Sequence, residues 1–195
     1  MPEPADDARI AATARETLAR AVRGLAAYHL DRPQEAAGCF RQARTLWRGL
    51  GDTRRVTGTW RKLGWVAAAQ GNLDEAIRLY RRALRGYQEP GTGTARQAAL
   101  TMIDLGTALT GAGRDGEAVT ILHEAAQLLS GQPDPYNIAR AEILETLAMV
   151  TARAGDRADA RLRYQEALAI LPTGHPRAGV IRGALAALPD PGGSR

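Results

Sequence analysis

The chain has 195 residues, of which 45% are hydrophobic and 24% charged, and its formal net charge is +5. This length suits one well-buried domain or a short array of repeats, and a single cysteine, Cys39, excludes an internal disulfide and a thiolate metal cage. No segment stays apolar for the roughly 18 residues of a membrane span, and the opening MPEPADDARI lacks the apolar region of a signal peptide. We therefore expect a cytoplasmic protein.

The basic charge is concentrated in the first half of the chain. Residues 1–98 carry 17 basic and 10 acidic groups, whereas residues 99–195 carry 9 and 11. Lys62 is the only lysine, and the other basic residues are arginine. Arginine suits phosphate and carboxylate recognition. In an Ala- and Gly-rich chain it can also reflect GC-rich coding, so the excess alone does not establish a nucleic-acid partner.

The predicted elements are helices in pairs, because apolar residues recur at spacings of three and four. Residues 1–16 extend the first helix at its N-terminus. Four copies of a helical hairpin follow in chain order, then a last helix and a tail. The copies span residues 17–50, 57–88, 99–130 and 141–172, the last helix spans 175–188, and the tail spans 189–195.

The copies share residue types at fixed positions. The first copy is the weakest and keeps Gly24, Ala36, Phe40 and Ala43. The second copy has Trp60, Leu63, Gly64, Gly71, Ala76, Tyr80 and Ala83. The third has Met102, Leu105, Gly106, Gly113, Ala118, Leu122 and Ala125, and the fourth has Leu144, Leu147, Ala148, Gly155, Ala160, Tyr164 and Ala167.

Each hairpin turns at a glycine, and Gly71, Gly113 and Gly155 follow one another at intervals of 42 residues. A glycine can adopt the left-handed conformation that ends a helix. The alanine five residues later is predicted to lie where the two helices cross, because a small side chain permits a close approach. Trp60 is predicted to be a core residue of the second hairpin, so that its truncation to alanine would cost about 3–5 kcal/mol.

The segments TWRKLGWVAAAQGNLDEAIRLYRRAL and LETLAMVTARAGDRADARLRYQEALAILP resemble tetratricopeptide repeats. The period of 42 residues exceeds the usual 34 and resembles that of kinesin light chains and of the sensor regions of bacterial regulators. The resemblance implies an all-α fold, a right-handed α-solenoid of four hairpins, with residues 175–188 as a capping helix. Val180, Ile181, Ala184 and Leu185 are expected to cover the end of the fourth hairpin, and residues 1–195 are expected to form one repeat domain.

In this family the first helix of each hairpin lines a concave groove, which implies a set of partner-binding residues. They are Tyr28, His29, Arg61, Trp65, Asp104, Thr107, Glu145 and Met149. Trp65 is the expected anchor, because a tryptophan in a concave patch is a typical hot spot. The alternative is that Trp65 packs between the first two hairpins.

The resemblance implies a scaffold for protein–protein or protein–peptide interaction, such as an adaptor or the sensor module of a bacterial regulatory system. A receptor for a short signalling peptide is an alternative use of the same groove. A clamp for a partner's C-terminal carboxylate is not expected, since Asp104 and Glu142 stand where such a clamp needs cations. A second copy of the chain could also cover the apolar groove.

A basic ridge is predicted on the second helices of the first two hairpins. Its members fall at spacings of three and four, which places them on one helical face. They are Arg41, Arg44, Arg48, Arg78, Arg81, Arg82 and Arg85. The ridge could bind nucleic acid or an acidic partner, or it could be a solvated face. Trp47, Tyr80 and Tyr87 fall at core spacing, so no aromatic side chain is expected to stack with bases on this face.

Catalysis is not expected. His29, His123 and His175 lie far apart in the repeat frame, and the chain has no metal-ligand cluster or phosphate-binding loop. We expect no metal and no cofactor.

Overall fold

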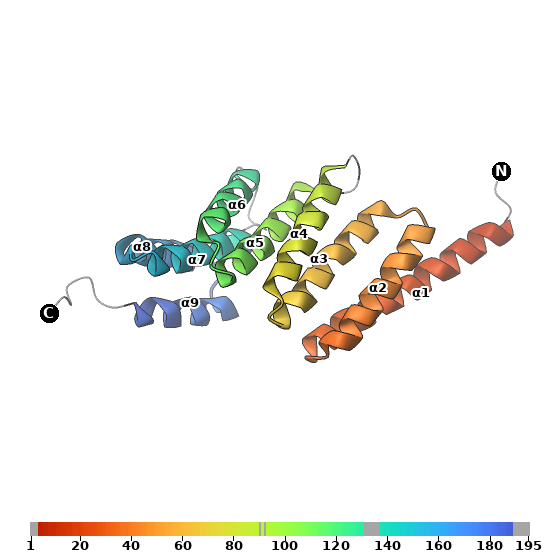
Figure 1. Cartoon of the computed structure of the whole chain (residues 1–195), viewed down its shortest axis with the longest axis horizontal. Coiled ribbons are helices and arrows are strands. Elements are labelled where there is room, and N and C mark those ends of the chain that lie inside the picture. Colours follow the sequence, from red (N-terminus) through yellow and green to blue (C-terminus); the bar gives the residue numbers. More distant parts are fainter. Residues whose placement is uncertain (1–3, 90, 92, 131–136, 189–195) are drawn as a thin grey trace. The chain divides into compact units, whose positions relative to one another are not determined.

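The computed structural model describes residues 4–89, 91, 93–130 and 137–188, with side chains from Arg9 onward. Within these ranges the chain forms nine α-helices and no strand (Figure 1). None of the described helices has both the length and the apolar character needed to cross a membrane. The hairpins pair α1 (Pro4–His29) with α2 (Pro33–Gly49), α3 (Thr53–Ala69) with α4 (Leu73–Gln88), α5 (Ala95–Gly111) with α6 (Asp115–Leu128), and α7 (Asn137–Arg153) with α8 (Arg157–Ile170). The last helix is α9 (Pro176–Ala187), so the predicted all-α fold of four hairpins and a further helix is confirmed.

The chain divides into two compact units, Met1–Thr94 and Ala95–Arg195. The first unit holds the hairpins α1–α2 and α3–α4, and the second holds α5–α6, α7–α8 and α9. The boundary falls between the second and third repeats. A single domain that spans residues 1–195 stays a prediction.

The corner glycines have the conformation that the repeat pattern predicts. Gly71, Gly113 and Gly155 have φ angles of 75°, 74° and 92°. At each corner the residue after the glycine donates its backbone N–H to a carbonyl one turn back, as Asn72 does to Ala67 at 2.9 Å. The first corner has the same closing bond but carries Asp31, with φ 54°, in place of glycine.

Small residues allow the two helices of each hairpin to pack closely. A Cβ atom on Gly24 would lie 2.7 Å from the Phe40 ring, and one on Gly106 would lie 2.7 Å from Leu122. The alanines that follow the corners have no exposed surface, as predicted for the helix crossings. They are Ala36, Ala76, Ala118 and Ala160.

The first helix of the second hairpin begins at Thr53, four residues before the predicted start of that copy. Asp52 caps it, since the Asp52 carboxylate accepts a hydrogen bond of 2.8 Å from the backbone N–H of Arg55. The helices α5 and α7 likewise begin four residues before residues 99 and 141. The repeat pattern thus missed the first turn of these helices, which is exposed at the start of α3 but includes the buried Ala139 in α7.

The last helix covers apolar surface of the fourth hairpin. Ile181 is fully buried in a cluster with Tyr164 and Ala148, and Ala184 and Leu185 pack against that cluster. Val180 was expected to join them, but its side chain is 64% exposed. The prediction for Val180 was wrong, because α9 presents a single stripe to the hairpin and Val180 lies beside that stripe.

Candidate functional site

The first unit brings together the four predicted groove residues that it contains. Tyr28 and His29 end α1, and Arg61 and Trp65 lie on α3. The ring centroids of Tyr28 and Trp65 are 6.1 Å apart, and those of Tyr28 and His29 are 5.5 Å apart in an edge-to-face arrangement. The Arg61 guanidinium lies 4.8 Å from the Trp65 ring centre. We call these four residues the Trp65 patch.

Trp65 both packs and faces solvent. Its side chain is half-buried, and its contact with Tyr28 joins the second hairpin to the first. The packing role that the sequence left open is therefore real. Part of the Trp65 surface nevertheless stays exposed beside the exposed His29. The Trp65 patch is thus an aromatic surface with one cation.

In the second unit the predicted groove residues are arranged differently. Asp104 is half-buried and Thr107 exposed on α5, and Met149 on α7 is 46% exposed. Glu145 is only 13% exposed and accepts a hydrogen bond of 2.6 Å from Arg177 of α9. Arg177 also forms an ion pair of 2.8 Å with Glu142. Glu145 is therefore already neutralised within its own unit, and a groove spanning all four hairpins stays a prediction.

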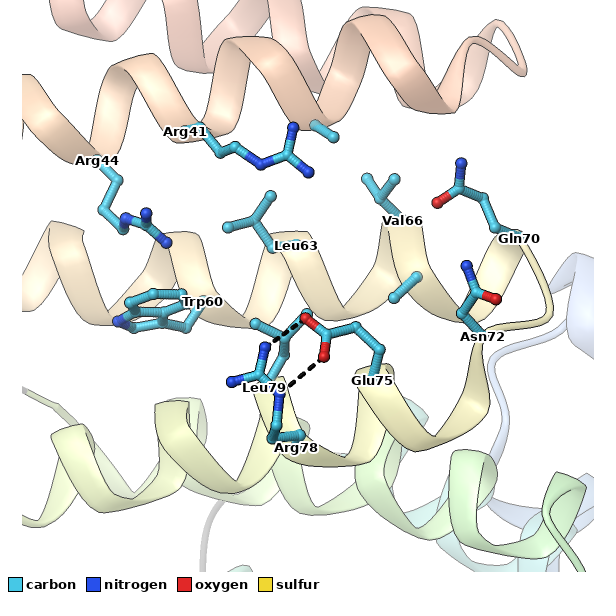
Figure 2. Close-up of a pocket in the computed structure, with 12 residues that line it drawn as sticks. Arg41, Arg44, Trp60, Leu63, Val66, Gln70, Asn72, Glu75, Arg78 and Leu79 are labelled. Carbon is cyan, nitrogen blue, oxygen red and sulfur yellow. Dashed lines mark hydrogen bonds and ion pairs between the residues drawn. The ribbon is translucent and has the colours of Figure 1, made fainter.

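Part of the predicted arginine ridge lines a cleft of about 370 Å³ between α2, α3 and α4. Figure 2 shows Arg41 and Arg44 reaching in from α2 over Leu63 and Trp60 of α3, with Glu75 and Arg78 of α4 on the opposite rim. The cleft is lined by Ala37, Arg41, Arg44, Trp60, Leu63, Val66, Ala67, Gln70, Asn72, Glu75, Arg78 and Leu79. We call it the Trp60 cleft.

Two arginines lie over the Trp60 ring. The guanidinium carbons of Arg44 and Arg82 are 3.8 and 3.9 Å from its ring centre, within the range of a cation–π contact. Trp60 is half-buried. The prediction that Trp60 is a core residue was wrong, whereas the prediction that no aromatic side chain on this face is suited to base stacking stays a prediction.

The arginines around Trp60 lack counter-charges. In the part of the chain that the structure describes, no carboxylate pairs with Arg41, Arg44, Arg48 or Arg82. The Arg44 Nε atom is buried and has no hydrogen-bond partner among the described residues. Burial lowers the pKa of Arg44, and the charges of Arg48, Arg82 and Arg41 lower it further. The cleft therefore concentrates positive charge at one point.

The remaining ridge residues differ from this cluster. Arg78 is satisfied, because its Nε and Nη2 atoms donate hydrogen bonds of 2.7 and 2.6 Å to the Glu75 carboxylate. Arg48, Arg81, Arg82 and Arg85 are not among the residues that line the cleft. A single ridge of all seven arginines stays a prediction, and the cleft and the arginines over Trp60 were not predicted from the sequence.

The three histidines have different surroundings. His29 belongs to the Trp65 patch, His123 is exposed on α6, and His175 caps α9 by accepting a hydrogen bond of 3.3 Å from the Arg177 backbone N–H. Among the described residues, no three His, Cys, Asp or Glu side chains are grouped so that they could hold a metal ion.

Comparison with known proteins identifies the repeats. A family model described as Tetratricopeptide repeat matches residues 15–89 and 97–173, which takes in most of the four hairpins. The crystal structure of BtubC (BKLC) from P. vanneervenii has a similar fold, with a TM-score of 0.60 and 19% sequence identity over 99% of this chain and 97% of BtubC. No curated protein matches the sequence. The chain belongs to the tetratricopeptide repeat family.

Proposed function

We infer that the chain is a protein-interaction module that binds a segment of another protein, or a short peptide, at the Trp65 patch. Family membership supports binding of a protein partner in general. The observation that carries the finer proposal is the contact of Tyr28, Arg61 and Trp65 on a half-buried surface. In this proposal the module acts in the cytoplasm as an adaptor or sensor of a bacterial regulatory system, and a short signalling peptide is one form of its ligand.

The Trp65 patch combines two features that favour binding of a protein segment: exposed aromatic surface and a positive charge. A half-exposed indole gives apolar area with little side-chain entropy to lose, and tryptophan and arginine are the residues most enriched at interface hot spots. Arg61 beside the ring adds a positive charge to the patch. We expect an apolar side chain of the partner to contact Trp65 and a polar or acidic neighbour to contact Arg61.

The test is capture of partners from the host lysate by the tagged wild-type chain, by Trp65→Ala and by a matched control, Val180→Ala. Val180 is 64% exposed and lies outside the Trp65 patch. A partner of the patch should be lost, by at least about tenfold in affinity, in Trp65→Ala alone. A partner retained equally by all three proteins would refute binding at Trp65. Circular dichroism checks that the variants remain folded.

A second candidate function is binding of nucleic acid or an acidic partner through the arginine ridge. The observation in its favour is the group of arginines around Trp60 that no described carboxylate neutralises. Such binding would weaken steeply with salt. Capture that disappears after nuclease treatment, and that does not depend on Trp65, would support the nucleic-acid form of this function.

A further inference from the structure

The Trp60 cleft is a separate surface from the Trp65 patch, and its lining indicates the chemistry of a ligand. The lining combines guanidinium groups from α2 and α4, the Trp60 ring, an apolar floor, two amides and the Glu75 carboxylate, which is paired with Arg78. The floor comes from Leu63, Val66 and Leu79, and the amides are Gln70 and Asn72. Figure 2 shows Arg44 and Trp60 at one end of the cleft and the two amides at the other.

One guanidinium group of the cleft is held in place before any ligand arrives. Arg44 contacts the Trp60 ring at a cation–π distance, and so does Arg82, which lies outside the cleft lining. A planar guanidinium presents its donors in the plane, where a carboxylate can accept two hydrogen bonds. The buried Arg44 Nε has no partner among the described residues, and an anion would supply one. The cleft thus favours an anionic group at its Arg44 end.

The same contacts argue against nucleic acid in this cleft. Two guanidinium groups lie over the Trp60 ring, so a base that stacked on Trp60 would compete with them. A fitting ligand is anionic near Arg41 and Arg44 and apolar over Leu63 and Val66.

We propose that the Trp60 cleft binds an acidic peptide segment in which an apolar side chain is flanked by carboxylates. The carboxylates pair with Arg41 and Arg44, the apolar side chain lies on Leu63 and Val66, and the amides of Gln70 and Asn72 hydrogen-bond to the peptide backbone. The inference rests on the acidic-partner form of the second candidate function, for which it names the site and the ligand, and it is independent of the Trp65 patch. It gives the first unit a second binding surface, formed by α2, α3 and α4.

The probe is the peptide Glu-Glu-Leu-Glu-Glu with a fluorescent label, and binding is measured by anisotropy. Two comparison peptides replace every Glu by Gln, or the Leu by Gly, and a short oligothymidylate represents nucleic acid. The proteins are the wild type, Arg41→Gln, Arg44→Gln and the matched control Arg85→Gln, which removes the same charge from an exposed site on α4 outside the cleft.

We expect Arg41→Gln and Arg44→Gln each to raise the Kd of the acidic peptide by about tenfold, and Arg85→Gln by less than about twofold. The Gln peptide should not bind, and the Gly peptide should bind more weakly. The indole N–H resonance of Trp60, assigned by its loss in Trp60→Phe, should shift on titration while that of Trp65 stays in place. Circular dichroism of each variant separates lost binding from lost folding.

Several results would overturn the inference. These are no saturable binding of the acidic peptide, equal binding of its Gln form, equal losses in Arg44→Gln and Arg85→Gln, or binding of oligothymidylate alone. The variant Trp65→Ala distinguishes this inference from the proposed function. It should bind the acidic peptide like the wild type, and a loss there would move the peptide to the Trp65 patch.

Discussion

Arginine has different roles in the two units. In the second unit arginines join elements through acids and carbonyls: Arg153 of α7 donates to Asp115 of α6 and, at 2.7 Å, to the Thr110 carbonyl of α5. Arg177 of α9 does the same with two acids of α7. In the first unit Arg44 and Arg82 stack on an aromatic ring instead. The net positive charge of residues 1–98 thus includes arginines that no described acid neutralises.

This difference distinguishes arginines that stabilise the fold from arginines that can bind another molecule. An arginine bound to acids has its donors occupied and stabilises the fold, whereas one held by stacking keeps its donors free for another molecule. Composition alone does not distinguish these roles, since arginine is frequent throughout the chain. The side chains that contact each arginine decide which role it has.

The largest expected effect is a loss of stability, and it tests the close helix crossing that both units share. Ala76 in the first unit and Ala118 in the second are both fully buried, and each follows its corner glycine by five residues. Replacing either by leucine should lower the free energy of unfolding by about 2–3 kcal/mol, because the close helix contact has no room for the larger side chain. Urea denaturation measures the loss. A negligible loss in one variant would show that the units differ in their cores as well as in their charges.

The next effect tests the arginine comparison directly. Arg177→Ala leaves Glu142 and the mostly buried Glu145 without their cation, and should cost about 2 kcal/mol. Arg41→Ala removes an exposed cation beside other cations, and should change stability by less than about 0.5 kcal/mol. Thermal unfolding of both variants is the measurement. Equal losses would contradict the division of roles.

A smaller effect concerns the first corner, where Asp31 has φ 54° while the other three corners have glycine. A side chain in the left-handed region is strained, so Asp31→Gly should stabilise the first unit by about 0.5–1 kcal/mol. The reverse change at the second corner, Gly71→Asp, should destabilise it by a similar amount. If both substitutions shift the melting temperature in the same direction, corner geometry is not the cause.

The sequence predicted the hairpins well because the signals for them are local. A corner glycine, an alanine five residues later and an apolar stripe are enough to define a hairpin, and all four copies carry most of these signals. The sequence also predicted correctly that Tyr28, His29, Arg61 and Trp65 share a face of the first unit. Helical periodicity decides which face a residue occupies.

What the sequence could not predict depends on contacts between helices. Trp60, Met102 and Leu144 occupy the same position of the repeat, so their shared register suggested a shared core role. Arg44 and Arg82 lie over Trp60 in the first unit. For Leu144 in the second unit, the positions that correspond to these two arginines are occupied by Ala126 and Glu166. The environment of this position comes from the second helices of two hairpins. The ion pair of Glu145 was not predicted for the same reason, since its partner Arg177 lies on α9.

A last expectation concerns an amine of the first unit. Lys62 is half-buried on α3, and burial lowers its pKa, with a further lowering from the charge of Arg61. Because the folded-state pKa lies below the unfolded value of about 10.5, the folded state binds its proton less readily than the unfolded state. The Lys62 amine therefore lowers the stability of the protein at neutral pH. This loss of stability disappears as the pH rises from the folded-state pKa to the unfolded-state pKa.

The variant Lys62→Met isolates this contribution. It should be more stable than the wild type at neutral pH, and the difference should shrink toward pH 10.5. Tyr164 in the second unit acts in the opposite direction, because burial and then Glu145 raise its pKa and stability falls once the unfolded phenol ionises. That effect occurs in both proteins and cancels in the comparison. A difference between Lys62→Met and the wild type that stays constant with pH would mean that the amine is solvated in the folded state.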